Sequence, residues 1–213
     1  MKVKTYLVLI LVIVIKLYGD EHPTRKVRKI SSKSKIISVE DMIMVRADGL
    51  KEQIPNFLDI KKEYFAYSGS RFYGAIENRG GGFPVSGKLG TEYYSYMLII
   101  ANKGNEGTIW AMTYISVPLV GFKPGLYKIK GRGKGDLERI GNIEYQIDAK
   151  HNRIIMSCEI SVLLGDKEFR AWYGKDSHAI GFATMINRTK VMPYKTEAID
   201  TTYPGTKIVL MNN

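Results

Sequence analysis

The chain has 213 residues, of which 45% are hydrophobic and 11% aromatic. This composition excludes a globally disordered chain and fits one folded domain, because it offers enough apolar surface to fill a single core. The formal net charge of +11 at pH 7 indicates attraction to anionic partners.

The first residues have the layout of a secretory signal peptide. Lys2 and Lys4 precede an apolar run over 6–15, and Gly19 stands just before charge resumes. Ten residues rise only about 15 Å as a helix, against the roughly 30 Å of a hydrocarbon core. We therefore expect a signal peptide over 1–19 that contacts a membrane only transiently; an uncleaved anchor is the alternative. The expected location is secreted, periplasmic or cell-envelope, which disfavours nucleic acid as a partner.

Residues 25–35, RKVRKISSKSK, hold too few apolar side chains to pack by themselves. Two interpretations stand side by side: an arm that contacts an anionic envelope polymer, lipid or polysaccharide, and a solvated spacer between the cleavage site and the fold. We expect 20–35 to be a flexible basic segment and 36–213 to form the folded domain.

Strand patterns begin at Ile36. Residues 36–49 are rich in β-branched side chains and end in the turn signal Asp48-Gly49, and the runs 63–67 and 71–78 flank a short Ser-Gly-Ser loop, which is typical of a hairpin. The runs 92–102 and 108–117 are apolar on both parities, so we expect central strands covered on both faces.

Three glycines, Gly80 to Gly82, follow the second strand of this hairpin. A phosphate cradle requires glycines that lead into a helix N-terminus, and the sequence contains neither GK[ST] nor GxGxxG. The run is instead predicted to be a long mobile loop of the kind on which binding sites often lie.

The stretch 143–160 contains the clearest hairpin, with His151-Asn152 as a two-residue loop. Further strands are expected at 125–131, 178–187 and 206–211, with a helical turn at 163–169. The predicted fold class is therefore all-β: an antiparallel, jelly-roll-like β-sandwich of about eight or nine strands with short helical turns.

A loop at His151-Asn152 would place Glu144 opposite Glu159. Two carboxylates about 5 Å apart are what retaining glycosidases use as nucleophile and acid/base. A water-facing pair on a solvated strand face is the competing interpretation, and a slip of one or two residues would separate the two carboxylates.

No other catalytic pattern is present. His22, His151 and His178 form no HExxH motif, Cys158 is the only cysteine, and GxSxG is absent. We expect no metal site and no cofactor, and we expect Cys158 to be a buried apolar filler.

Aromatic side chains are the better binding candidates, because flat faces with polar tips suit sugar rings. Trp110 and Tyr114 share a strand face and are expected in the core, whereas Trp172 and Tyr173 stand at the end of an element. The predicted ligand contacts are Trp172, Tyr173, Tyr73, Arg79 and Phe83. A separate signal, Asn187-Arg188-Thr189, matches an N-glycosylation acceptor.

Two stretches carry a family resemblance. FLDIKKEYFAYSGSRFYGAIEN resembles the early hairpin of extracellular DOMON-type domains and the related family-9 carbohydrate-binding modules. NIEYQIDAKHNRIIMSCEISVLLGD is similar to their closing hairpin. The resemblance covers about Asn56 to Asp166 and implies an exported β-sandwich that binds sugar or a small cofactor. The haem ligands of some such domains have no counterpart that can be assigned here.

The predicted function is an exported, non-catalytic binding or cell-envelope-associated module with a glycan, or a cell-envelope polymer, as its ligand. A secreted glycan hydrolase using Glu144 and Glu159 is one alternative. A structural subunit of a surface assembly is the other.

Overall fold

The computed structural model describes residues 24–51, 53–87, 91–102, 105–115, 122–130, 137–173, 179–191, 194–202 and 205–211. The predicted signal peptide lies outside these ranges. None of the helices within them has the length and apolar character that a membrane crossing needs.

The described part is mostly strand. Its strands are β1 (Thr24–Arg28), β2 (Ile43–Ala47), β3 (Ile60–Tyr67), β4 (Arg71–Asn78), β5 (Glu92–Asn102), β6 (Asn105–Ile115), β7 (Gly125–Lys130), β8 (Leu137–Gly141), β9 (Glu144–Asp148), β10 (Arg153–Glu159), β11 (Ala179–Val191), β12 (Tyr194–Thr201) and β13 (Thr206–Met211). Its helices are the single turns η1 (Val39–Asp41) and η2 (Asn56–Leu58), then α1 (Ile160–Gly165) and α2 (Lys167–Tyr173).

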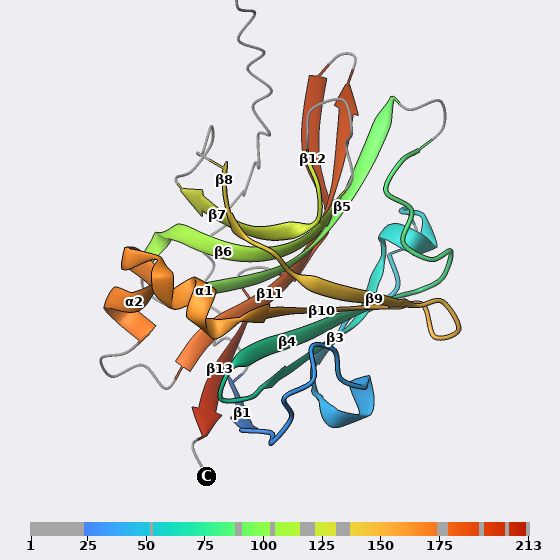
Figure 1. Ribbon diagram of the computed structural model, residues 1–213. Coiled ribbons are helices and arrows are strands. Elements are labelled where there is room, and N and C mark those ends of the chain that lie inside the picture. The colour runs from blue at the N-terminus through green and yellow to red at the C-terminus, as the bar shows by residue number, and fades with distance from the viewer. Residues whose placement is uncertain are drawn as a thin grey trace, which may run out of the picture.

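These strands form two stacked sheets (Figure 1). The large sheet has the order β1-β13-β11-β5-β6-β7-β8, and β12 also pairs with β11; the small sheet has the order β2-β3-β4-β10-β9. The strand pairings are antiparallel except for β1 with β13. The predicted all-β antiparallel sandwich is therefore confirmed, with more strands than the eight or nine expected.

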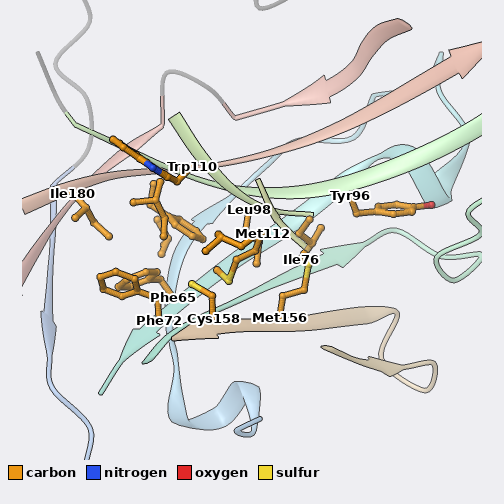
Figure 2. Packing of buried hydrophobic residues seen from close by; sticks show 14 of the residues in the cluster. Phe65, Phe72, Ile76, Tyr96, Leu98, Trp110, Met112, Met156, Cys158 and Ile180 are labelled. Atoms are coloured by element: carbon orange, nitrogen blue, oxygen red, sulfur yellow. The ribbon is translucent and has the colours of Figure 1, made fainter. Parts of the chain in front are cut away.

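The space between the sheets holds the main hydrophobic core. Alternation along each strand directs every second side chain inward, so Phe65, Leu98 and Met156 from three strands meet there (Figure 2). Trp110 is 1% exposed, and Cys158 is fully buried among the same residues, as expected for a core tryptophan and an apolar filler.

β5 is covered on both faces, which confirms its prediction as a central strand. Tyr96 and Leu98 lie in the core between the sheets, whereas Met97 and Ile99 belong to a second buried cluster on the outer face of the large sheet. β11 and β6 flank β5 over most of its length.

The N-terminal part differs from the flexible segment expected over 20–35. Of these residues, 24–28 form β1, which pairs in parallel with β13 and buries Val27 in the core. The chain then crosses to the small sheet, where Ile30 N donates to Tyr67 O over 2.9 Å. The apolar alternation around Val27 is too short to stand out among the flanking cations, so sequence pattern alone does not predict β1.

Residues 30–42 next cover the outer face of the small sheet. Ile37, Val39 and Met42 pack there against Tyr64 and other outward-facing side chains of β3, β4 and β10. In Figure 1 this covering segment is the blue stretch that follows β1. Both faces of the small sheet are therefore buried near its centre.

Candidate functional site: a polar groove on the small sheet

A groove of about 310 Å³ lies between the covering segment and strands β9 and β10. This volume is at the lower end of the range for small-molecule sites, about 300–1,000 Å³. The residues that line the groove are Ile36, Ile37, Ser38, Val39, Glu40, Gln146, Asp148, Arg153 and Ile155. Aliphatic and hydrogen-bonding side chains therefore meet in one recess.

Strand geometry brings the polar side chains together. Gln146 and Asp148 stand two residues apart on β9 and so point to the same face. On the neighbouring strand, Arg153 pairs with Asp148 and Ile155 with Gln146. β9 is the edge strand of the small sheet, which leaves Gln146 exposed to solvent.

Arg153 is held firmly where it lines the groove. Its Nε donates to Glu77 Oε2 over 2.9 Å, and its Nη1 donates to Glu40 Oε1 over 3.3 Å. The guanidinium carbon also lies 5.6 Å from the centre of the Tyr64 ring, within cation–π range. These contacts fix the plane of the guanidinium and present it to the groove.

The carboxylates around Arg153 remain ionised. Burial would raise the pKa of Glu77, but hydrogen bonds from Lys61, Arg153 and Tyr64 outweigh it and lower that pKa to about 2. The hydrogen bond from His151, 2.7 Å from Asp148 Oδ2, lowers the pKa of Asp148. The hydrogen bond from Ser38 lowers the pKa of Glu40.

Gln146 differs from its charged neighbours because its side chain is free of hydrogen bonds within the described part of the chain. Over the described residues its amide makes no hydrogen bond, so both its carbonyl oxygen and its NH₂ group are available to a ligand. Together with Asp148 and Arg153 it supplies donors and acceptors above the aliphatic side chains of Ile37, Val39 and Ile155.

The register of the β9–β10 hairpin corrects the predicted carboxylate pair. Glu144 lies opposite Ser157, two residues away from Glu159, because the loop has four residues with Asn152 at φ 51°. A slip of two residues keeps every side chain on its face, so alternation alone could not detect it.

Each of the two glutamates has its own cationic partner. Glu144 lies 2.8 Å from Lys35 Nζ, and Glu159 lies 3.2 Å from Arg71 Nη1. The hydrogen bond from Lys35 lowers the pKa of Glu144, the opposite of the raised pKa that a general acid needs. The predicted direct juxtaposition of the two carboxylates is therefore wrong.

The five predicted ligand contacts do not form one surface. Tyr73 and Phe83 are buried, at 0% and 6% exposure. Arg79 donates from Nε to Asp59 Oδ2 over 3.0 Å and from Nη2 to the Asp48 carbonyl over 2.6 Å, and it is not among the residues that line the groove.

Trp172 and Tyr173 belong to an aromatic cluster at the end of the sandwich where α2 lies. The Phe169 ring lies 5.0 Å from each of their rings, and the Trp110 ring lies 6.0 Å from that of Trp172. Both side chains are half-buried against the main core. Their role as ligand contacts remains a prediction.

The glycine run is tied into the fold. Gly80, Gly81 and Gly82 all have positive φ, which only glycine adopts readily. Asn78 Nδ2 donates to Gly82 O over 2.5 Å, and the buried Phe83 packs on Tyr96 with ring centres 4.9 Å apart. The run forms a tight turn that leads Phe83 into the core.

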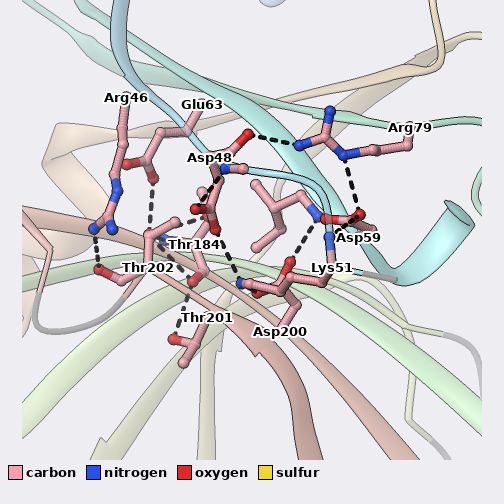
Figure 3. A network of polar contacts seen from close by, with 12 residues as sticks. Arg46, Asp48, Lys51, Asp59, Glu63, Arg79, Thr184, Asp200, Thr201 and Thr202 are labelled. Carbon is pink, nitrogen blue, oxygen red and sulfur yellow. Dashed lines mark hydrogen bonds and ion pairs between the residues drawn. The ribbon is translucent and has the colours of Figure 1, made fainter. Parts of the chain in front are cut away.

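A buried polar network joins the two sheets beside β2, β3 and β12 (Figure 3). Ile60 N of the small sheet donates to Asp200 Oδ2 of the large sheet over 2.7 Å, and Lys51 forms an ion pair with the same Asp200. Arg79 and Asp59 extend the network. Sequence reasoning missed it because its members lie far apart along the chain.

Glu63 is one of the buried carboxyls of this network, with Asp59 and Asp200. Thr202 Oγ1 donates to Glu63 Oε2 over 3.0 Å, whereas Glu63 Oε1 has no hydrogen-bond partner within the described ranges. Burial raises the pKa of Glu63 to about 7. The described residues contain no group of three or more His, Cys, Asp or Glu side chains arranged to hold a metal ion.

The glycosylation signal falls on the interior of the fold. Asn187 is 1% exposed in the middle of β11, and its Nδ2 lies 3.0 Å from Met97 Sδ. An acceptor asparagine must be accessible, so this site is closed in the folded chain.

Among known proteins, similarity to this chain is found at the level of structure. No family model matches the chain, and no curated protein matches it either. Among solved structures, a family-9 carbohydrate-binding module from Caldicellulosiruptor kristjanssonii, in complex with cellotriose, is similar to this chain. The two chains are 10% identical in sequence, and the TM-score of the match is 0.45. The match covers 89% of this chain and 95% of the carbohydrate-binding module.

Proposed function

We propose that this protein is an exported, non-catalytic binding module whose ligand is a glycan and whose binding site is the groove beside β9. The observation that carries the proposal is the convergence of Gln146, Asp148 and Arg153 above an aliphatic floor. A sugar presents hydroxyl groups around its edge and C–H groups on its faces. It therefore needs both kinds of contact.

The chemistry of the three side chains suits hydroxyl groups. A carboxylate accepts, a guanidinium donates, and an amide does both, so vicinal hydroxyls can be bound in either direction. The side chains belong to paired strands and not to a loop, which fixes their relative positions before the ligand arrives. A rigid set of this kind supports selective binding to one arrangement of hydroxyl groups.

Export and a secreted, periplasmic or cell-envelope location form part of the proposal. Their support is the sequence alone: two early lysines, an apolar run over 6–15 and the small residue Gly19. Expression in a secretion-competent host, followed by N-terminal sequencing of the exported chain, tests this part. We expect a new N-terminus at residue 20; full-length protein retained in the cytosol would contradict it.

The ligand can be identified on an array of neutral and charged oligosaccharides, with wild type beside two variants. Arg153→Gln removes the fixed guanidinium of the groove, and we expect it to abolish the array signal. Trp172→Phe tests the alternative aromatic site and should leave the signal unchanged. Loss of signal in Trp172→Phe with retention in Arg153→Gln would move the site to α2 and contradict the proposed location.

A further inference from the structure

A band of cations wraps around one edge of the sandwich, outside the groove. The sequence from Arg25 to Lys35 holds six basic residues and no acidic residue. In the structure this stretch is β1 followed by the crossing to the small sheet. The cations are therefore displayed on ordered backbone.

Part of the band faces outward from the large sheet. Val27 points into the core, so its neighbours Lys26 and Arg28 point to the opposite, outer face. Both side chains are exposed, and among the described residues neither forms an ion pair with a carboxylate. Their charges are available to a partner.

The rest of the band lies against the other face of the sandwich. Ser34 O accepts from Tyr73 Oη over 2.7 Å, and Lys35 O accepts from Ser157 Oγ. Tyr73 belongs to the cluster on the outer face of the small sheet. Lys33, exposed next to these anchors, also has no carboxylate partner in the described part of the chain.

We propose that this band, from Arg25 to Lys35, binds a linear acidic polysaccharide that passes around the edge of the sandwich. A flat lipid surface cannot meet the outer faces of both sheets together, whereas a flexible chain of carboxylate- or sulfate-bearing sugars can. The stretch contains no aromatic residue. Single-stranded nucleic acid is bound largely by stacking on such rings, so the polysaccharide is the better fit.

This second surface lies outside the groove and takes an acidic ligand. It tethers the module to an anionic matrix while the groove selects its own glycan. Lys35, the last cation of the band, lies 2.8 Å from Glu144 on β9, so the band ends beside the groove.

The test is a titration of the chain from residue 20 with a linear polyuronate at several salt concentrations. Lys26→Gln, Arg28→Gln and Lys33→Gln are combined in one variant. A matched variant combines Lys123→Gln, Lys167→Gln and Arg170→Gln, three exposed cations elsewhere that carry the same charge change. Neutral oligosaccharide bound in the groove serves as a folding control for both.

We expect the band variant to lose at least tenfold in polyuronate affinity at low salt. Its slope of log affinity against log salt should fall by about one for each cation that contacted the polymer. The matched variant should behave as wild type. Equal losses of polyuronate affinity in the two variants would mean that net charge alone, and not the position of the cations, determines binding. That result would overturn the proposal.

Two more measurements test the chemical class of the partner and whether the polymer contacts the outer faces of both sheets. Anionic phosphatidylglycerol vesicles and a single-stranded oligonucleotide should bind more weakly than the polyuronate; tighter binding of either would overturn the assignment. Lys33→Gln and the pair Lys26→Gln with Arg28→Gln should each weaken binding separately. If only one face contributes, the polymer does not wrap around the edge.

Discussion

Arg153 on β10 and Glu77 on β4 occupy directly opposed positions and form an ion pair, with Arg153 Nε 2.9 Å from Glu77 Oε2. The pair is largely shielded from water, at 17% and 5% side-chain exposure, so it is worth more than a pair on the surface. It also connects the fold to the proposed site, because the same guanidinium lines the groove.

Removing Arg153 should therefore affect stability and binding together. Arg153→Gln leaves the Glu77 carboxylate with Lys61 and Tyr64 as partners, and we expect the free energy of unfolding to fall by about 1–3 kcal/mol. Urea denaturation measures this loss. Arg153→Lys keeps the charge but not the planar fork, so it should recover part of the stability and little of the binding. Full recovery of binding by lysine would contradict the geometric role.

Glu63 should give the fold an unusual pH dependence. Its folded pKa, raised by burial to about 7, lies above the ordinary glutamate value of 4.5. Its contribution to stability is then fully present below about 4.5 and is lost as pH rises through about 7. Glu63→Gln cannot ionise and so does not show this loss. The unfolding free energy of the variant, relative to that of wild type, should therefore rise by up to about 3 kcal/mol from about pH 4 to about pH 8.

The measurement is the difference in unfolding free energy between Glu63→Gln and wild type across that pH range. Glu138→Gln, a change at an exposed position of β8, is the control for the loss of one carboxylate. A difference for Glu63→Gln that does not change with pH would contradict the raised pKa of the buried carboxyl.

Cys158 should be inert in the folded chain. Burial raises the pKa of its thiol to about 12, and its side chain is enclosed by the main core. Because the thiolate is the reactive form, an aromatic disulfide reagent at pH 8 should label Cys158 only after denaturant is added. Rapid labelling under native conditions would mean that the β10 side of the core opens easily.

β1 should make the residues before Ile36 necessary for full stability. A chain that starts at Ile36 loses the strand that pairs with β13 and leaves the site of Val27 empty. We expect its Tm to lie several degrees below that of a chain starting at residue 20, because an apolar side chain and an edge strand are both lost. Equal Tm values would support the flexible segment that the sequence first indicated.

The sequence predicted the parts of this fold that depend on local pattern. The β3–β4 hairpin, the double-sided β5 and the buried Cys158 all follow from alternation and from a short polar loop. Alternation assigns a side chain to a face, but it does not measure how far one strand slides along another. The position of Glu144 relative to Glu159 therefore needed the structure.

The candidate site depends on contacts that sequence spacing does not encode. Glu40 and Arg153 meet in the groove although more than a hundred residues separate them. Aromatic faces suit sugar rings, which made Tyr73 and Phe83 predicted ligand contacts, yet both side chains are buried in the interior. Gln146, the exposed and uncommitted amide, carries no sequence signal beyond its place on a polar strand face.

Gln146 offers the most direct test of the groove as a glycan site. Calorimetric titration of the array-selected oligosaccharide should compare wild type with Gln146→Ala and with Gln53→Ala, the same change at an exposed glutamine outside the groove. We expect Gln146→Ala to weaken affinity about tenfold, the loss of roughly 1.4 kcal/mol from one or two hydrogen bonds, with Tm unchanged. Gln53→Ala should bind as wild type. Unaltered affinity in Gln146→Ala would contradict the groove as the binding site.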